Sequence, residues 1–189
     1  LRVLMTGISY LDSDATLRAV KPWLERLNET LDETVHLARL DGRDIVYLAT
    51  KESTQYLRVI NRVGRRLPAS TTSLGKALLA AQPPGQIESH LYQTLPRLTE
   101  FTITDRSALD ADLDEVRRRG YALDLQENTL GLKCFGFAIP IQSPPTDAIS
   151  CSVPLARLSP DREKTIVETI SDAVRDIARN APSGSLTAY

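Results

Sequence analysis

The sequence predicts an α+β fold, a largely antiparallel sheet of about six strands with helices covering one face. Segments with the two-residue period of strands form two groups of three, and a run of helical segments separates the groups. This order differs from the regular alternation of strand and helix that builds parallel sheets. With 189 residues and no internal repeat, the chain is long enough for one domain with a full hydrophobic core.

The first helix is predicted over residues 13–31, where apolar side chains recur at steps of three and four. Ser13 or Asp14 can cap its first turn. Pro22 in its middle predicts a break or a fresh helix start, because proline removes a main-chain donor.

Three strands are predicted next, over residues 33–40, 44–51 and 56–63. The Asp-Gly pair at 41–42 is a strong signal for a hairpin between the first two. The third strand is expected to end at Gly64.

The middle of the chain predicts three short helices, over residues 70–82, 84–95 and 107–119. A Ser or Thr hydroxyl can cap the first of them, and Ser107 is the predicted cap of the third. Arginines in the last turn and Gly120 after it mark the end of the third helix.

The second group of strands is predicted over residues 121–126, 133–141 and 147–153. Ser159 as cap and Pro160 in the first helical position predict a final amphipathic helix. These elements complete the sheet and give it a last covering helix.

The last predicted strand carries an unusual pattern. Alternation places Ser150 and Ser152 on one face and Ile149, Cys151 and Val153 on the other. An apolar strand that presents two hydroxyls on one face raises the possibility of a polar site there. In the preceding strand, Cys134 falls on a face of small residues, which leaves room beside it or packs against a helix.

Composition excludes several classes of function. A net charge of −1, with 25% charged and 42% hydrophobic residues, gives no basic field for nucleic acid. No apolar run reaches the roughly 20 residues that span a bilayer, so we expect a cytoplasmic protein without a membrane partner. Two isolated cysteines and two isolated histidines predict no metal site and no cofactor. A disulfide between the cysteines stays open as the less favoured alternative, because nothing in the sequence suggests a secreted framework.

Two polar segments have both a structural and a functional interpretation. The Gly-Lys pair at 75–76 is no phosphate loop, because Ala77 follows it. The hydroxyls of residues 70–73 can simply cap a helix, or the free N–H groups there can bind an anion such as a carboxylate. Asp124 at a strand end can accept a ligand hydroxyl, or form a solvated turn with residues 126–128.

Two further functions stay open on the residues alone. In a small cysteine-dependent enzyme, Cys134 would be the nucleophile, His36 or His90 the base, and the helix start at residues 71–74 the oxyanion site. In a pure oligomerisation module, the sheet face that carries the hydroxyls would be packed and dry.

Four segments together resemble the effector-binding domain of IclR-type bacterial transcription regulators. They are LDETVHLARLDGRDIVYLA, VGRRLPASTTSLGKALLA, GYALDLQENTLGLKCFGFAIPI and AISCSVPLARLSPDR. The resemblance implies a GAF-like fold. It also implies that residues 1–12 are the remnant of a linker helix, residues 13–180 the effector-binding domain and residues 181–189 a flexible tail.

The resemblance further implies a ligand site, whose residues carry over by motif as Thr71, Thr72, Ser73, Leu74, Asp124, Leu132, Cys134, Ser150 and Ser152. In the family such a pocket binds small organic acids, so the expected partner is a small carboxylate, a sugar acid or keto acid of carbohydrate catabolism. Where many relatives have His and small residues, this chain has ASTTSL, so we expect a more polar ligand. The resemblance implies a homodimer or homotetramer that contacts DNA only through a winged helix-turn-helix N-terminal to this segment.

Overall fold

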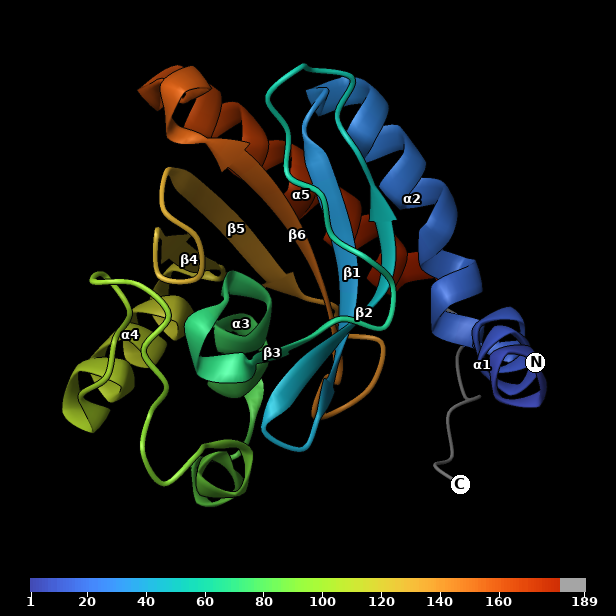
Figure 1. The fold of residues 1–189 in the computed structure, drawn as a ribbon. Coiled ribbons are helices and arrows are strands. Elements are labelled where there is room, and N and C mark those ends of the chain that lie inside the picture. Colours follow the sequence, from blue (N-terminus) through green and yellow to red (C-terminus); the bar gives the residue numbers. More distant parts are fainter. Residues whose placement is uncertain (181–189) are drawn as a thin grey trace.

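A computed structural model describes residues 1–180 as one six-stranded antiparallel sheet flanked by helices (Figure 1). The strand order is β3-β2-β1-β6-β5-β4. The strands are β1 Thr34–Asp41, β2 Asp44–Lys51, β3 Arg66–Pro68, β4 Ala122–Leu125, β5 Leu132–Ala138 and β6 Asp147–Pro154. This confirms the predicted α+β fold. The tail expected at residues 181–189 lies outside the described residues.

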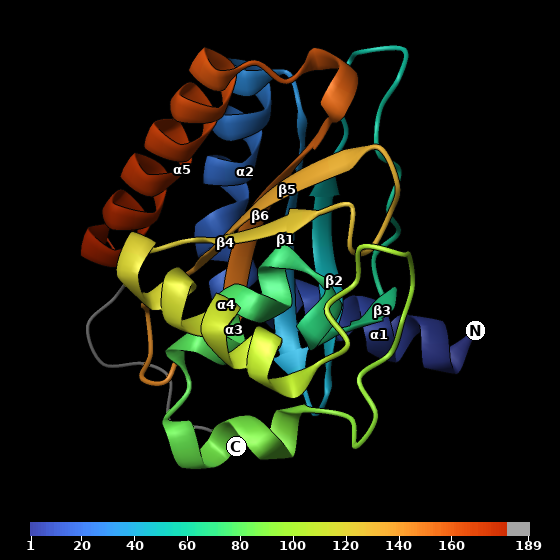
Figure 2. The same cartoon turned by 90° about the vertical axis from the view of Figure 1, so that its left-hand side faces the viewer.

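The helices lie on both faces of the sheet rather than on one (Figures 1 and 2). They are α1 Arg2–Ser13, α2 Ala15–Leu31, α3 Ser73–Ala81, α4 Arg106–Arg119 and α5 Pro160–Asn180. The helices α2 and α5 cover one face side by side, whereas α3 lies on the other face with α4 outside it. The sequence predicts a single covered face, and this is wrong because α3 packs on the second one.

Strand alternation supplies a separate core for each face. The first core joins apolar side chains of β1, β5 and β6, such as Leu37, Phe135 and Ile149, to the buried stripes of α2 and α5. The second core joins α3 to the opposite face of the sheet and to α4. No helix within residues 1–180 combines the length and the apolar character needed to cross a bilayer.

Residues 56–63 do not form the predicted strand. The third strand is the shorter β3, which pairs with residues 44–46 of β2. Tyr56, Leu57, Ile60 and Val63 are exposed, so they do not provide the buried face that their spacing suggests. The connection between β2 and β3 instead crosses the same face of the sheet as α3 (Figure 1).

Several helix signals act differently in the fold. Pro22 lies inside α2 without ending it, because its own side is exposed while Val20 and Leu24 are buried against the sheet. Asp105, not Ser107, caps α4, and its Oδ1 accepts an N–H at 2.9 Å. The helix predicted over 84–95 is a shorter 3₁₀ helix, Pro84–His90. Asp14 caps α2 as one of the two predicted residues, and its Oδ1 accepts an N–H at 2.7 Å.

A close backbone contact fixes the position of α3 on the sheet. A Cβ atom at Gly136 of β5 would lie 2.2 Å from the carbonyl oxygen of Ser73 and 2.8 Å from the main-chain nitrogen of Leu74. The sheet therefore accepts the first turn of α3 only where β5 has no side chain.

Replacing Gly136 with Ala is expected to lower the free energy of unfolding by on the order of 1–3 kcal/mol, because the methyl group forces α3 off the sheet. Urea unfolding measures the loss. Gly85→Ala is the control: a Cβ atom there meets nothing within 4 Å, so its effect should stay within about 0.5 kcal/mol. Equal effects of the two substitutions would show that the contact does not constrain the fold.

Candidate functional site

A cavity of about 450 Å³ opens on the sheet face that α3 covers only in part. Side chains of β2, β4, β5 and β6 form its floor. Its walls are the first turn of α3, residues 57–61 of the β2–β3 connection, and residues 128–131 before β5. Small-molecule sites commonly enclose roughly 300–1,000 Å³, so the cavity has the size of such a site.

The structure brings together all but one of the predicted site residues. Those that line the cavity are Thr72, Ser73, Leu74, Asp124, Leu132, Cys134, Ser150 and Ser152. Thr71 is buried in the 3₁₀ turn before α3, where its Oγ1 donates to the carbonyl oxygen of Pro68 at 3.0 Å, and it does not line the cavity.

Strand register explains why distant residues meet. Asp124 of β4 lies opposite Cys134 of β5, and Cys134 lies opposite Ser152 of β6. Because paired residues share a face, these polar side chains form one row across the sheet. Ser150 lies two residues along β6 on the same face. The hydroxyl face of β6 is thus turned toward the cavity, while Cys151 faces the α2–α5 core.

The start of α3 contributes main-chain donors. Thr72 caps the helix, since its Oγ1 accepts the N–H of Gly75 at 2.9 Å. The N–H groups of Ser73 and Leu74 belong to the first turn, where helix geometry gives them no acceptor within the helix. Both residues line the cavity. The capping interpretation of this segment is thus confirmed for Thr72, and the N–H groups of Ser73 and Leu74 are free to donate to a polar group of a ligand.

Asp124 is buried and shapes the loop that follows it. Its Oδ1 accepts the main-chain N–H groups of Glu127 at 2.8 Å and of Asn128 at 3.2 Å. Burial, together with repulsion from the Glu127 carboxylate, raises the pKa of Asp124 to about 6. The carboxyl group therefore accepts hydrogen bonds at neutral pH and gains a donor proton just below it.

Lys76 is a buried charge whose role the sequence does not predict. Its side chain is 1% exposed, and its Nζ lies 2.5 Å from Glu127 Oε1 and 2.9 Å from Asp112 Oδ2. The cluster ties α3 to α4 and to the loop after Asp124. A lone lysine within an otherwise apolar helix is the sequence signal that could have indicated a buried ion pair.

The geometry does not activate Cys134. Burial and the nearby Asp124 carboxylate raise the pKa of its thiol well above the ordinary value, against a hydrogen bond with Ser152. His36 Nδ1 lies 3.1 Å from the Thr50 hydroxyl. His90 Nδ1 lies 2.7 Å from a main-chain oxygen of the β1–β2 turn. Cys134 and the helix start share the cavity, but neither histidine lines it, so the structure does not bring the base of the cysteine-enzyme hypothesis to its nucleophile.

Cys134 and Cys151 are both free thiols. They lie on adjacent strands and point to opposite faces of the sheet. Across residues 1–180, no group of three His, Cys, Asp or Glu side chains could hold a metal ion.

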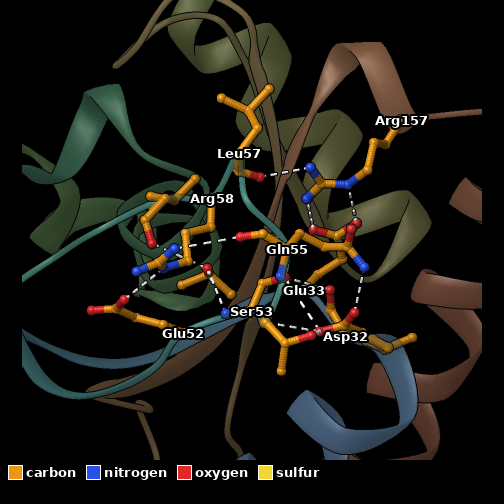
Figure 3. Close-up of polar contacts among 12 residues, drawn as sticks. Asp32, Glu33, Glu52, Ser53, Gln55, Leu57, Arg58 and Arg157 are labelled. Atoms are coloured by element: carbon orange, nitrogen blue, oxygen red, sulfur yellow. Dashed lines mark hydrogen bonds and ion pairs between the residues drawn. The ribbon is translucent and has the colours of Figure 1, made fainter.

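Sequence reasoning missed one wall of the cavity, the β2–β3 connection, because its apolar spacing predicts a strand. Polar anchors hold this segment (Figure 3). Asp32, in left-handed conformation after α2, accepts the N–H of Thr54 at 2.9 Å. Arg157 donates to the carbonyl oxygen of Leu57 at 2.6 Å and to the buried Glu33 carboxylate at 2.6 Å.

Comparison with known proteins finds a family match over most of the chain. A family model described as bacterial transcriptional regulator IclR C-terminal matches residues 8–179. The HTH-type transcriptional regulator BhcR of Paracoccus denitrificans (strain Pd 1222) is 32% identical over 174 residues, which are 91% of this chain and 62% of that protein. The chain spans less than two thirds of the length of the first curated relatives it matches.

Solved structures share the fold. The crystal structure of the Thermotoga maritima IclR superposes with a TM-score of 0.88 at 26% identity, over 95% of this chain and 74% of that one. An IclR homolog from Microbacterium hydrocarbonoxydans, complexed with 4-hydroxybenzoate, has a TM-score of 0.81 at 25% identity, over 92% of this chain and 72% of that one.

Replacing Asp124 with Asn is expected to stabilise the chain increasingly as the pH rises. Folding raises the pKa of Asp124 from 3.8 to about 6, so the folded chain binds more protons between those values. The protonated Asp124 carboxyl therefore stabilises the fold relative to the ionised one. This contribution to stability is full below about pH 4 and is lost as the pH rises through 6. At pH 7.5 the variant should gain up to about 3 kcal/mol in the free energy of unfolding.

Urea unfolding at several pH values between 4.5 and 7.5 measures this difference. Asp12→Asn, at an exposed position of α1, controls for the loss of one negative charge. A difference between Asp124→Asn and the unmodified chain that stays constant with pH would rule out the raised pKa.

Proposed function

The chain belongs to the IclR family of bacterial transcriptional regulators, and from this premise we propose that its cavity binds a small organic acid as effector. The observation that carries the proposal is the polar row of Asp124, Cys134 and Ser152, with Ser150 beside it, in a cavity of about 450 Å³. A packed oligomerisation face would leave no such cavity. It would also bury the two serine hydroxyls without partners, which is energetically costly.

The chemistry of the lining favours a hydroxylated acid. Apolar walls from residues such as Leu74 and Leu132 exclude water, while few polar groups fix the orientation of a ligand. The hydroxyls of Ser150 and Ser152 can donate to ligand keto or hydroxyl groups, and the Asp124 carboxylate can accept from ligand hydroxyls. We therefore favour a sugar acid of carbohydrate catabolism over a short keto acid. The 4-hydroxybenzoate in the related structure supports a small carboxylate as the class of ligand.

The regulatory mechanism that we propose is a population shift. A ligand with different affinities for two subunit arrangements changes their ratio, and with it the spacing of the DNA-reading helices. Residues 1–12 would act as the linker toward a winged helix-turn-helix, and the assembly would be a homodimer or homotetramer in the cytoplasm. Helix α1 supports a linker role, since none of its residues is buried in the domain. Cys134 has no catalytic role in this proposal.

A thermal-shift panel of D-gluconate, D-galacturonate, 2-keto-3-deoxygluconate, pyruvate and 4-hydroxybenzoate tests the proposal. A ligand at about 100 times its Kd should add roughly 2.7 kcal/mol, which raises the Tm by about 5–10 °C. The Ser150→Ala, Ser152→Ala double variant should lose most of this shift, whereas Ser89→Ala, at an exposed position, should keep it. A response to pyruvate alone would contradict the sugar-acid preference, and no response to any acid would contradict acid binding.

A further inference from the structure

Arg65 lies beside the cavity on an extension of the sheet. Tyr47 donates its N–H to the carbonyl oxygen of Arg65 at 3.0 Å, and Gly64 donates to that of Tyr47 at 2.8 Å. Since Val46 pairs with Arg66 in the adjoining register, Arg65 lies opposite Tyr47 and its side chain shares the same face. Both residues line the cavity.

Arg65 is exposed at the rim of the cavity that it lines, and its charge also reaches groups below the cavity floor. Burial, and after it the positive charge of Arg65, lowers the pKa of the His36 imidazole to about 3. The same charge partly opposes the rise that burial causes in the pKa of the Tyr47 phenol. His36 is buried and its ring lies edge-on to that of Tyr47, with centroids 5.1 Å apart. The positive charge of Arg65 is therefore felt at the cavity floor, although the residue itself remains open to solvent and to a ligand.

Among the cations that line the cavity, Arg65 is the one without a carboxylate partner in residues 1–180. Arg58 Nε pairs with Glu52 Oε2 at 3.0 Å. Arg65 Nη1 instead donates to the neutral Asn61 Oδ1 at 2.5 Å, and no carboxylate oxygen of the described residues lies within 4.0 Å of its side chain. A guanidinium in this position has donors left for an anion, which it can bind through two parallel hydrogen bonds.

The opposite end of the cavity disfavours an anion. Asp124 belongs to β4 at one edge of the sheet, whereas Arg65 extends β3 at the other edge. A ligand carboxylate next to Asp124 would meet a like charge, and one next to Arg65 an opposite charge. We infer that Arg65 pairs with the carboxylate of the acid, which points its chain toward Ser150, Ser152 and Asp124. The inference rests on the function proposed above and assigns a residue that determines ligand class.

This orientation also favours longer acids. Three strand spacings, roughly 14 Å, separate the main chain of Arg65 from that of β6, and the side chains at both ends cover only part of that distance. A six-carbon hydroxy acid can engage Arg65 and the β6 hydroxyls together. A three-carbon keto acid reaches one of the two groups, so it forgoes part of the binding free energy.

Isothermal titration with D-gluconate and with its neutral amide, D-gluconamide, tests the inference. Arg65→Gln should weaken gluconate binding roughly 10- to 100-fold, the usual range for one lost charge-assisted pair. Arg65→Lys should recover part of this loss, because it keeps the charge but not the planar fork. Gluconamide has no charge to lose, so its affinity should change less than about twofold. Arg62→Gln is the matched control, an exposed arginine of the same loop that does not line the cavity.

Each outcome decides a separate question. Equal weakening of acid and amide by Arg65→Gln would assign Arg65 a merely structural role and overturn the inference. An unchanged gluconate affinity in that variant would overturn it as well, while leaving the proposed function in place. If the unmodified chain binds neither gluconate nor any other acid of the panel, the proposed function fails, and the inference fails with it.

Discussion

The contact between the first turn of α3 and Gly136 is the constraint on which the site depends. Because the helix backbone rests directly on β5, α3 covers one part of the sheet and leaves the adjoining part open. The helix start then forms a wall of the cavity. Lys76, one turn later in α3, points into the interior of the protein. The cavity is therefore set by where the sheet can accept a helix, rather than by the residues that line it.

The buried ion pair of Lys76 and Glu127 links the position of α3 to that of Asp124 in the polar row. Lys76 holds Glu127, whose main-chain N–H in turn donates to Asp124. Desolvation offsets much of the Coulomb attraction in such a buried pair, so its net contribution to stability is small, but removing one partner leaves an uncompensated charge. The ion pair thus acts mainly by specifying one arrangement of the loop. A single arrangement keeps the Asp124 carboxyl directed at the cavity.

Part of the site follows from the sequence, because strand alternation alone places Ser150, Ser152 and Cys134 on faces that register then brings together. For Asp124 and the start of α3 the residues left a structural and a functional interpretation open, and the family resemblance selected the functional one and added Leu132. The 57–61 wall escaped prediction, since the apolar spacing of that segment is the same whether it pairs in a sheet or crosses one. Arg65 and Tyr47 were not recognised as lining residues, because the cavity that they line depends on this wall. The spacing of apolar residues shows which side of a segment is apolar, but not which other segment it packs against. Pro22 failed as a helix breaker for the related reason that tertiary packing of α2 outweighs the local cost.

Arg39 of β1 connects β6, the strand that carries Ser150 and Ser152, to the helices α1 and α2. From β1 it pairs with Asp147 at 2.7 Å, where β6 begins, and with Asp14 at 2.5 Å, at the junction of α1 and α2. It also donates to the Tyr10 hydroxyl of α1 at 2.8 Å. One guanidinium thus contacts the strand that carries Ser150 and Ser152 and the helix that leads toward the N-terminus. Any displacement of Asp147 along β1 must change the contacts at the α1–α2 junction, because the arginine cannot move with one carboxylate and stay with the other.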